Sequence, residues 1–239
     1  MIESLIEQHL KEFKAKNILD VGPGYGNFSR VATLTTGAKK ITFIDCNSSV
    51  LAFQEEECKK AHIVCESLSM SLDLVELSKI EGTYDLILCQ EILEHLINAE
   101  EVLAALVHRL SENGQIIITV PTKFSEKLIK LLNPNYMKYE LYGHVREYNK
   151  HDIIKLLNGV GLTPLVFLPA QPHYFIFHVW IFSLRVKVDG STGEIFSKDI
   201  RVHVGSILST FTKKFFKLTG FKFWSRLFPR NYFIIAGRI

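Results

Sequence analysis

Two short segments near the N-terminus carry acidic side chains and glycines in a pattern that suits a ligand-binding loop. The first reads NILDVGPGYG at residues 17–26, in which an apolar strand contains Asp20 near its end. Three glycines follow at alternate positions: Gly22, Gly24 and Gly26. Because glycine has no Cβ, its backbone can adopt positive φ angles and approach a ligand closely. The second segment reads ITFID at residues 41–45 and ends in Asp45, which can accept hydrogen bonds from both hydroxyls of a ribose. Together these residues predict a nucleoside pocket.

The spacing of the glycines indicates which nucleoside is bound. A dinucleotide loop of the form G-x-G-x-x-G/A needs a small residue three positions after Gly24, where this chain has Asn27. A nicotinamide oxidoreductase is therefore disfavoured. The pattern present, Asp-x-Gly-x-Gly-x-Gly, resembles motif I of the class I S-adenosylmethionine-dependent methyltransferases. In that family the acid at the position of Asp20 lies near the methionine part of the cofactor. An acid suits this cationic ligand better than a pyrophosphate, because like charges repel strongly in a low-dielectric cleft.

Strand-like segments alternate with helical patterns along the chain, which favours an α/β fold with a mostly parallel sheet covered on both faces. We expect strands at residues 17–21, 40–44, 62–65, 84–89, 115–120, 162–168 and 232–237. The family resemblance implies a Rossmann-like sheet of seven strands whose last strand is antiparallel and lies beside the sixth. We expect Asn98 and Glu101 to form a capping box, and Asn149 to cap a helix over residues 150–157.

The same pattern divides the chain into a core and an insertion. We expect a cofactor-binding methyltransferase core over residues 1–171, a basic aromatic insertion over residues 172–230 and the final strand of the core sheet over residues 231–239. A length of 239 residues suits one large domain with such an appendage.

A second group of polar residues, QEILEH at residues 90–95, directly follows the predicted fourth strand. Ligands of open α/β sheets bind beyond the carboxyl ends of the strands, so these side chains are expected in the cleft. The spacing i, i+3, i+4 would bring Glu91, Glu94 and His95 to one side of a helical turn, as a partial ligand shell for Mg²⁺ or a softer divalent ion.

This run resembles the corresponding segment of the ubiquinone O-methyltransferase type and of the small-RNA 3′-terminal 2′-O-methyltransferases. In both, the Glu-x-x-Glu-His pattern can hold a divalent metal, and in the RNA enzymes a histidine from the region of His144 completes the site. A metal-free alternative remains open, because many relatives use a similar Glu-His pair only to close the cofactor pocket. Glu94, His95 and His144 are the candidate catalytic residues. Either histidine could act as a general base near neutral pH, or a metal would lower the pKa of the acceptor hydroxyl.

The resemblance also implies which residues contact S-adenosylmethionine: Asp20, Gly22, Gly24, Tyr25, Gly26, Asp45, Cys46, Ser67, Leu68 and Gln90. Tyr25 would close over the methionine end, and Cys46 would lie beside the adenine. Gln90 would lie beside the methionine carboxylate or the sulfonium. Ser67 and Leu68 follow the predicted third strand, in the region that contacts adenine in the family.

The C-terminal segment has a charge of its own. Residues 201–239 contain eight Lys or Arg and no Asp or Glu, whereas the whole chain has a net charge of only +3. Helical spacing places five apolar side chains on a single face, with lysines on the opposite face. The apolar residues are Ile207, Leu208, Phe211, Phe215 and Leu218. Such a helix can lie on anionic lipid, so we expect peripheral membrane contact through this segment. The alternative is a cationic lid whose apolar face packs on the domain's own core.

The remaining features indicate a cytoplasmic protein, with membrane association through the C-terminal segment. The four cysteines form no C-x-x-C pair and are expected to be reduced core thiols. The start of the chain does not read as a secretory signal. The longest apolar region, residues 175–184, is shorter than the roughly 20 residues of a membrane span.

The resemblance implies transfer of a methyl group to a hydroxyl of a small acceptor, including one that is lipid-linked. One alternative is RNA 2′-O-methylation with a divalent metal, in which the basic aromatic tail would contact phosphates and stack on bases. Nucleic acid is the less favoured partner. The other alternative is a non-catalytic nucleoside-binding protein that contacts a membrane or a partner.

Overall fold

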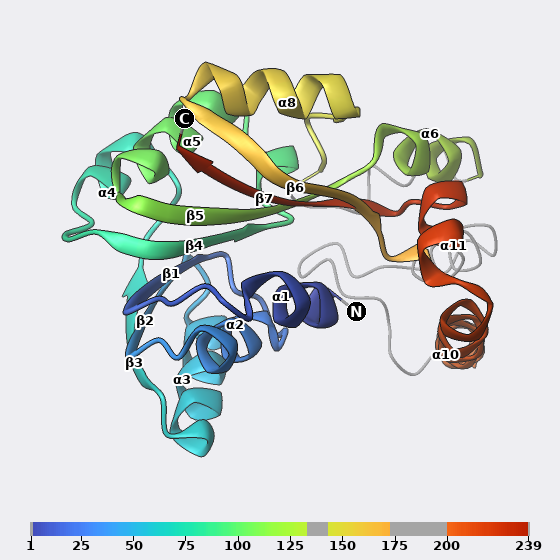
Figure 1. The fold of residues 1–239 in the computed structure, drawn as a ribbon, viewed down its shortest axis with the longest axis horizontal. Helices are drawn as coiled ribbons and strands as arrows, with labels where there is room; N and C mark the ends of the chain where they lie inside the picture. The colour runs from blue at the N-terminus through green and yellow to red at the C-terminus, as the bar shows by residue number, and fades with distance from the viewer. Residues whose placement is uncertain (1, 133–142, 173–199, 239) are drawn as a thin grey trace.

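A computed structural model describes residues 2–132, 143–172 and 200–238, and the following concerns these residues (Figure 1). A seven-stranded sheet forms the centre, in the order β3-β2-β1-β4-β5-β7-β6. The strands are β1 (Asn17–Val21), β2 (Lys40–Asp45), β3 (Val64–Ser69), β4 (Tyr84–Gln90), β5 (Leu110–Pro121), β6 (Leu162–Ala170) and β7 (Asn231–Arg238). The pairs from β3 to β5 are parallel, and β7 runs antiparallel to both β5 and β6. The predicted fold class is confirmed, including the inserted antiparallel last strand.

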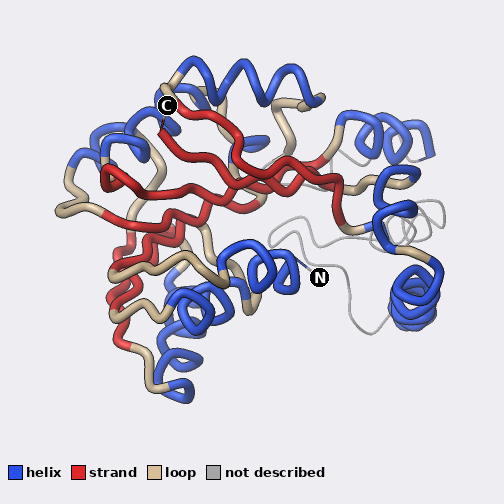
Figure 2. Tube along the Cα trace, in the orientation of Figure 1, coloured by secondary structure: helices blue, strands red, loops and turns tan. Residues whose placement is uncertain are grey.

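Helices cover both faces of this sheet, as Figure 2 shows. They are α1 (Ile2–Leu10), α2 (Phe28–Thr36), α3 (Ser48–Ala61), α4 (Leu74–Ser78), the 3₁₀ turn η1 (Leu93–His95), α5 (Ala99–His108), α6 (Lys123–Leu132), α8 (Lys150–Gly159), α10 (Ile200–Thr219) and α11 (Phe221–Leu227). Successive strand residues point to opposite faces, so Ile18 packs with α1, α2 and α3, whereas Leu19 packs with α4, α5 and α8. Burial on both faces explains why the strands read as continuous apolar runs.

The third strand differs from its prediction. His62 does not begin the strand but ends α3, as a C-cap residue with a left-handed φ of 57°. The chain therefore enters β3 only at Val64 and stays in it to Ser69. Ser67 and Leu68, which were expected after the strand, lie inside it.

Helix caps were predicted with mixed success. Asn149 caps α8, and with Asp152 it forms a full capping box. The predicted box of Asn98 and Glu101 is wrong: Asn98 stands at the N-cap of α5, but its side chain makes no capping hydrogen bond.

The C-terminal helices α10 and α11 lie beyond the edge at which β5 and β6 end, and α11 leads into β7 there (Figure 1). Phe216 is buried, and its ring stacks on Trp224 with centroids 4.8 Å apart. Trp224 also donates a hydrogen bond from Nε1 to Thr219 Oγ1 at 2.7 Å, so the two helices form one unit.

The apolar face predicted on α10 points outward. Its side chains are 45–86% exposed at Ile207, Phe211, Phe215 and Leu218, and Leu208 is half-buried. The alternative in which this face packs on the core is therefore not what the described residues show. Another face of α10, which carries Phe216, packs on α11.

No helix in the three described ranges is long and apolar enough to cross a membrane. The apolar run at residues 175–184 lies outside those ranges, as does most of the first half of the expected insertion. The domain boundaries at residues 171 and 230 remain a prediction.

Candidate active site

The glycine-rich loop leaves β1 in a conformation that needs glycine at two positions. Gly22 has a φ of +65° and Gly24 a φ of +55°, whereas Gly26 is not left-handed, contrary to expectation. The amide of Gly22 donates to the carbonyl of Ile44 at 2.8 Å, which ties the loop to β2. A Cβ on Gly22 would lie 2.2 Å from the Cδ1 atom of Ile92, in the segment after β4. Gly22 thus allows the loop to pack closely against the other half of the site.

Gln54 holds this loop and was missed from the sequence. It lies buried on α3, and its Nε2 donates to the carbonyls of Gly24 at 2.7 Å and Gly26 at 3.1 Å. The available signal was its position on the buried face of α3, with Val50, Leu51 and Cys58. A polar residue at such a position needs a partner, which here is the loop backbone.

Two acids flank the loop as predicted, and their environments differ. Asp20 is 2% exposed and accepts a hydrogen bond from the hydroxyl of Ser29. Burial raises the pKa of Asp20 to about 7; the hydrogen bond from Ser29 opposes this rise and the nearby charge of Asp45 adds to it. Asp45 is only half-buried at the end of β2, where its Oδ1 accepts from the amide of Asn47 at 2.8 Å. Asp20 is therefore the acid whose charge depends on a neighbouring cation.

The remaining predicted cofactor residues are spread around this loop. Tyr25 is 53% exposed and meets the ring of Phe53 edge-on at 5.2 Å. Cys46 is exposed just beyond β2. Gln90 is 9% exposed at the end of β4, and its buried Oε1 accepts no hydrogen bond from the described residues. An orphaned acceptor of this kind suits a ligand that donates.

The register of β3 changes which residues lie beside Asp45. Asp45 pairs with Ser69, and the amide of Met70 donates to the carbonyl of Asp45 at 3.2 Å. Ser67 is two residues further back along the strand. Ser69 and Met70, rather than Ser67 and Leu68, therefore lie beside Asp45 at the end of β3.

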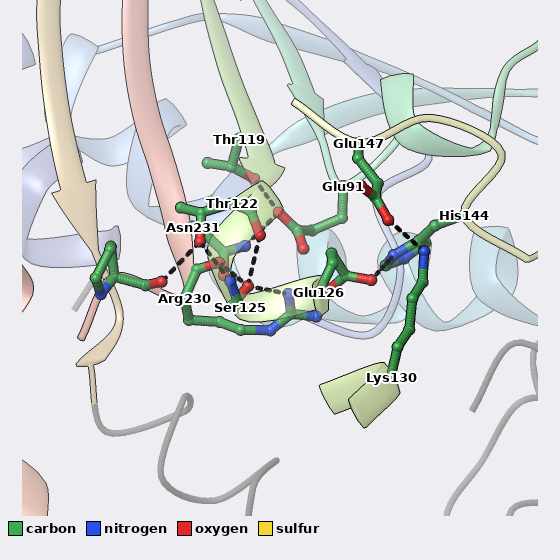
Figure 3. Close-up of polar contacts among 11 residues, drawn as sticks. Glu91, Thr119, Thr122, Ser125, Glu126, Lys130, His144, Glu147, Arg230 and Asn231 are labelled. Atoms are coloured by element: carbon green, nitrogen blue, oxygen red, sulfur yellow. Dashed lines mark hydrogen bonds and ion pairs between the residues drawn. The ribbon is translucent and has the colours of Figure 1, made fainter. Parts of the chain in front are cut away.

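The segment after β4 does not form the expected helical turn. Glu91 has a left-handed φ of 55°, and a single 3₁₀ turn follows over Leu93–His95. Glu91 is directed to β5 and β7, where its Oε1 accepts from Thr119 Oγ1 at 2.9 Å and from Asn231 Nδ2 at 2.5 Å (Figure 3). The predicted alignment of Glu91 with Glu94 and His95 is therefore wrong.

A different trio comes together. Glu94, His95 and His144 each place one potential ligand atom within 4.8 Å of the others. The two imidazole rings meet edge-on with centroids 4.8 Å apart. His144 was predicted to join this group although it is about 50 residues away in the chain.

Hydrogen bonds hold the segment after β4 to the segment that carries His144. The amides of Val145 and Arg146 both donate to the carbonyl of Glu94, at 2.9 and 3.1 Å. The Tyr148 hydroxyl donates to the carbonyl of Leu93 at 3.1 Å, and Arg146 Nε donates to that of Leu96 at 2.9 Å. These four hydrogen bonds thus fix the position of His144 beside Glu94.

Glu94 is the least satisfied acid of the site. It is 1% exposed, and neither carboxylate oxygen accepts a hydrogen bond from another described residue. Burial raises its pKa well above the ordinary value, and the charge of Glu91 raises it further; contact with its own amide and the charge of Arg230 oppose this weakly. One buried carboxylate and two imidazoles are donors that fit a divalent cation.

Behind His144 lies a pair of charges that the sequence did not reveal. His144 Nδ1 is 2.8 Å from Glu126 Oε2, and the other oxygen of Glu126 is 2.6 Å from Arg230 Nη1 (Figure 3). All three side chains are at most 7% exposed. Glu126 and Arg230 are 104 residues apart and carry no local motif, so only the fold brings them together.

Comparison with known proteins places this geometry in a family. Residues 2–166, more than half of the chain, match the family described as "Methyltransferase domain". The chain belongs to this family. The match confirms the resemblance to class I methyltransferases that motif I and the QEILEH segment indicated.

Curated relatives support the same placement. The ubiquinone biosynthesis O-methyltransferase of Rickettsia typhi is 28% identical over 160 residues, which cover 65% of this chain and 61% of that protein. An uncharacterised Synechococcus protein is 30% identical over 103 residues, 43% of this chain and 25% of that protein. The chain therefore spans less than two thirds of the length of these relatives.

Solved structures share the methyltransferase-family fold over nearly the whole chain. An S-adenosylmethionine-dependent methyltransferase of Clostridium acetobutylicum has a TM-score of 0.61 at 14% identity and covers 99% of this chain and 90% of that one. The [4+2]-cyclase SpnF has a TM-score of 0.62 at 11% identity, covering 99% and 80%. Since a cyclase shares the fold, these likenesses show architecture only, and function must be argued from the site.

The loop geometry generates a test of the cofactor pocket. In Gly22→Ala, a left-handed φ and the contact with Ile92 both oppose the added Cβ, so the loop must move. We expect affinity for S-adenosylhomocysteine, measured by calorimetry, to fall by at least about tenfold. Gly37→Ala is the matched control, because Gly37 also has a left-handed φ, of +70°, but open space around it at the end of α2. Unchanged affinity in Gly22→Ala would contradict the placement of the pocket.

Proposed function

We propose that this member of the methyltransferase family uses S-adenosylmethionine to methylate a hydroxyl group of a small acceptor. The observation that carries the proposal is the position of the Glu94, His95 and His144 group, which follows β4 next to the glycine-rich loop after β1. The neighbouring strands β1 and β4 both end at this edge of the sheet. The ubiquinone biosynthesis O-methyltransferases among the relatives support an oxygen as the methyl acceptor.

In this proposal the cofactor lies along the ends of β1, β2 and β4. Asp20 and Gln90 take the methionine end, where Asp20 compensates positive charge and the orphaned Oε1 of Gln90 accepts a hydrogen bond. Asp45 accepts from the ribose hydroxyls, and Ser69 and Met70 stand beside it toward the adenine. Tyr25, with its exposed ring, covers the loop.

The reaction is an in-line displacement, in which alignment of donor and acceptor is the main task of the protein. The acceptor oxygen attacks the methyl carbon, and the bond from sulfur to that carbon breaks with its electron pair left on sulfur. The products are a methyl ether and S-adenosylhomocysteine. The hydroxyl proton passes to an imidazole nitrogen of His144, which acts as the general base.

A divalent ion is compatible with the same residues. Glu94, His95 and His144 would hold it, and the buried carboxylate of Glu94 would gain the positive charge that burial demands. When bound, the ion would lower the pKa of the acceptor hydroxyl.

We further propose that the acceptor is lipid-linked and that α10 and α11 contact the membrane that holds it. Helix α10 lies beyond the sheet edge that carries the site (Figure 1), and its apolar side chains at Ile207, Phe211, Phe215 and Leu218 are exposed. Five exposed cations accompany them: Lys213, Lys214, Lys217, Lys222 and Arg226. Apolar burial combined with attraction to anionic headgroups is the mode of an interfacial helix. We place this contact on the cytoplasmic side, in keeping with four cysteines that are all free thiols.

The two other functions considered from the sequence are less well supported. Neither RNA methylation nor a non-catalytic role is favoured by the family or by the relatives. The basic surface can bind lipid phosphates as well as nucleic acid phosphates. It also carries exposed aliphatic side chains, which binding to nucleic acid would leave in water.

His144→Ala tests the mechanism. We expect methyl transfer to phenolic acceptors, followed with isotope-labelled S-adenosylmethionine, to slow by about 10²–10⁴-fold, with cofactor affinity unchanged. His108→Ala, an exposed histidine at the end of α5, should retain full activity. If a chelator abolishes the activity of the unmodified protein and Mg²⁺ restores it, the metal-assisted mechanism is selected. Full activity in His144→Ala would refute the role of this residue.

The membrane contact is tested by flotation with vesicles that contain anionic phospholipid. Phe211→Asp together with Phe215→Asp should abolish flotation, because both rings are more than half exposed and both lie on the outward face of α10. Val75→Asp replaces an equally exposed apolar residue on α4 and should leave flotation intact. Binding of the double variant at the level of the unmodified protein would end the proposal. Binding only to neutral vesicles would contradict the role of the cations.

A further inference from the structure

Three charged or titratable side chains form a buried chain that ends at His144. His144 lies in the segment after residue 142, Glu126 lies in the first turn of α6, and Arg230 directly precedes β7. Their exposed fractions are 7%, 1% and 5%. Burying charges costs free energy, and such pairs are often no better for stability than apolar packing. The arrangement therefore calls for an explanation other than stability.

The central carboxylate uses its two oxygens on different partners. Oε2 lies 2.8 Å from His144 Nδ1, and Oε1 accepts a hydrogen bond from Arg230 Nη1 at 2.6 Å. The guanidinium of Arg230 keeps its positive charge at any physiological pH, and its contact with Oε1 stabilises Glu126 as an ionised carboxylate.

An ionised carboxylate can only accept hydrogen bonds. The contact of 2.8 Å therefore requires a hydrogen on Nδ1 of His144. In a neutral imidazole only one ring nitrogen carries hydrogen, so Nε2 then holds the lone pair. The identity of the basic nitrogen follows from the partner on the other side of the ring.

Arg230 is itself held firmly. Its amide donates to the carbonyl of Ala170 at 3.1 Å, and its carbonyl accepts from the amide of Thr122 at 2.9 Å and the hydroxyl of Ser125 at 3.0 Å. Its guanidinium also donates to Ser125 Oγ at 3.1 Å. The guanidinium is therefore fixed relative to β5, β6 and α6, and it fixes Glu126 in turn (Figure 3).

We propose that Glu126 and Arg230 are positioning residues that hold His144 as the Nδ1–H tautomer and keep its Nε2 lone pair for the reaction. The kinetic part of this inference rests on the proposed function, in which His144 is the general base. The tautomer assignment does not rest on that function. The same tautomer would also suit a His144 that binds a metal through Nε2, because a ligand histidine is oriented by the hydrogen bond of its other nitrogen.

The tautomer can be read directly from the full-length protein. In long-range ¹H–¹⁵N correlation spectra of histidine-labelled protein, with His144→Gln to assign the signal, we expect a protonated Nδ1 and an unprotonated Nε2 at neutral pH. A spectrum with the hydrogen on Nε2 would overturn the inference. This experiment uses neither cofactor nor acceptor, so it stands even if no methyl transfer is found.

Variants at position 126 separate positioning from packing. Glu126→Leu removes the acceptor, so the Nδ1–H form should lose its predominance and kcat should fall by at least about tenfold, with KM for the acceptor little changed. Glu126→Gln keeps a carbonyl that can accept from Nδ1, and should restore both the tautomer and most of kcat. Glu147→Gln is the control, since Glu147 lies nearby in an ion pair with Lys130.

The outcomes are distinct. If Glu126→Leu folds and keeps the Nδ1–H tautomer and full kcat, positioning by Glu126 is disproved. If Glu126→Leu does not fold, the spectra of the unmodified protein and of Glu126→Gln still decide. If the spectra are as expected but no acceptor is methylated, the proposed function fails while the tautomer assignment remains.

Discussion

Carboxylates buried at the carboxyl edge of the sheet need a positive charge beside them, and this requirement organises both halves of the site. Asp20 and Glu94 are each at most 2% exposed, and burial raises the pKa of both. An ionised carboxyl group is costly in such surroundings unless a cation or several hydrogen bonds compensate it. A sulfonium or ammonium group would compensate Asp20, and a proton or divalent ion would compensate Glu94. The site is thus built to be completed by its ligands.

Glu126 shows how the fold satisfies an acid from within. Because β7 is antiparallel to its neighbours, its first residue lies at the edge where the parallel strands end, and Arg230 and Asn231 reach the site from there. Arg230 neutralises Glu126, while Asn231 donates to Glu91. The start of the inserted strand and the residue before it therefore supply the cation that neutralises Glu126, and they connect α10 and α11 to the group of Glu94, His95 and His144.

The sequence was most informative where a short segment contains the whole signal. The alternating glycines, the acids at two strand ends and the apolar strands identified the family and the fold. They also predicted a nucleoside pocket, and the spacing of Glu94 and His95 predicted where the active site lies. Contacts between distant segments were not accessible: Gln54 reaches the loop from α3, and Arg230 meets Glu126 across 104 residues. The errors have local causes as well. A left-handed His62 delays β3, and a left-handed Glu91 breaks the expected helical turn.

The most direct test of this account is calorimetric titration of S-adenosylmethionine between pH 6 and pH 8. The pKa of Asp20 is raised to about 7, so the carboxyl group is mostly protonated below that pH. A cationic ligand binds the ionised form better, and affinity must therefore rise with pH through this range, with release of a proton on binding. Asp20→Asn should bind weakly and without this dependence. Affinity that is independent of pH, or an Asp20→Asn protein that binds as well as the unmodified one, would contradict the central claim.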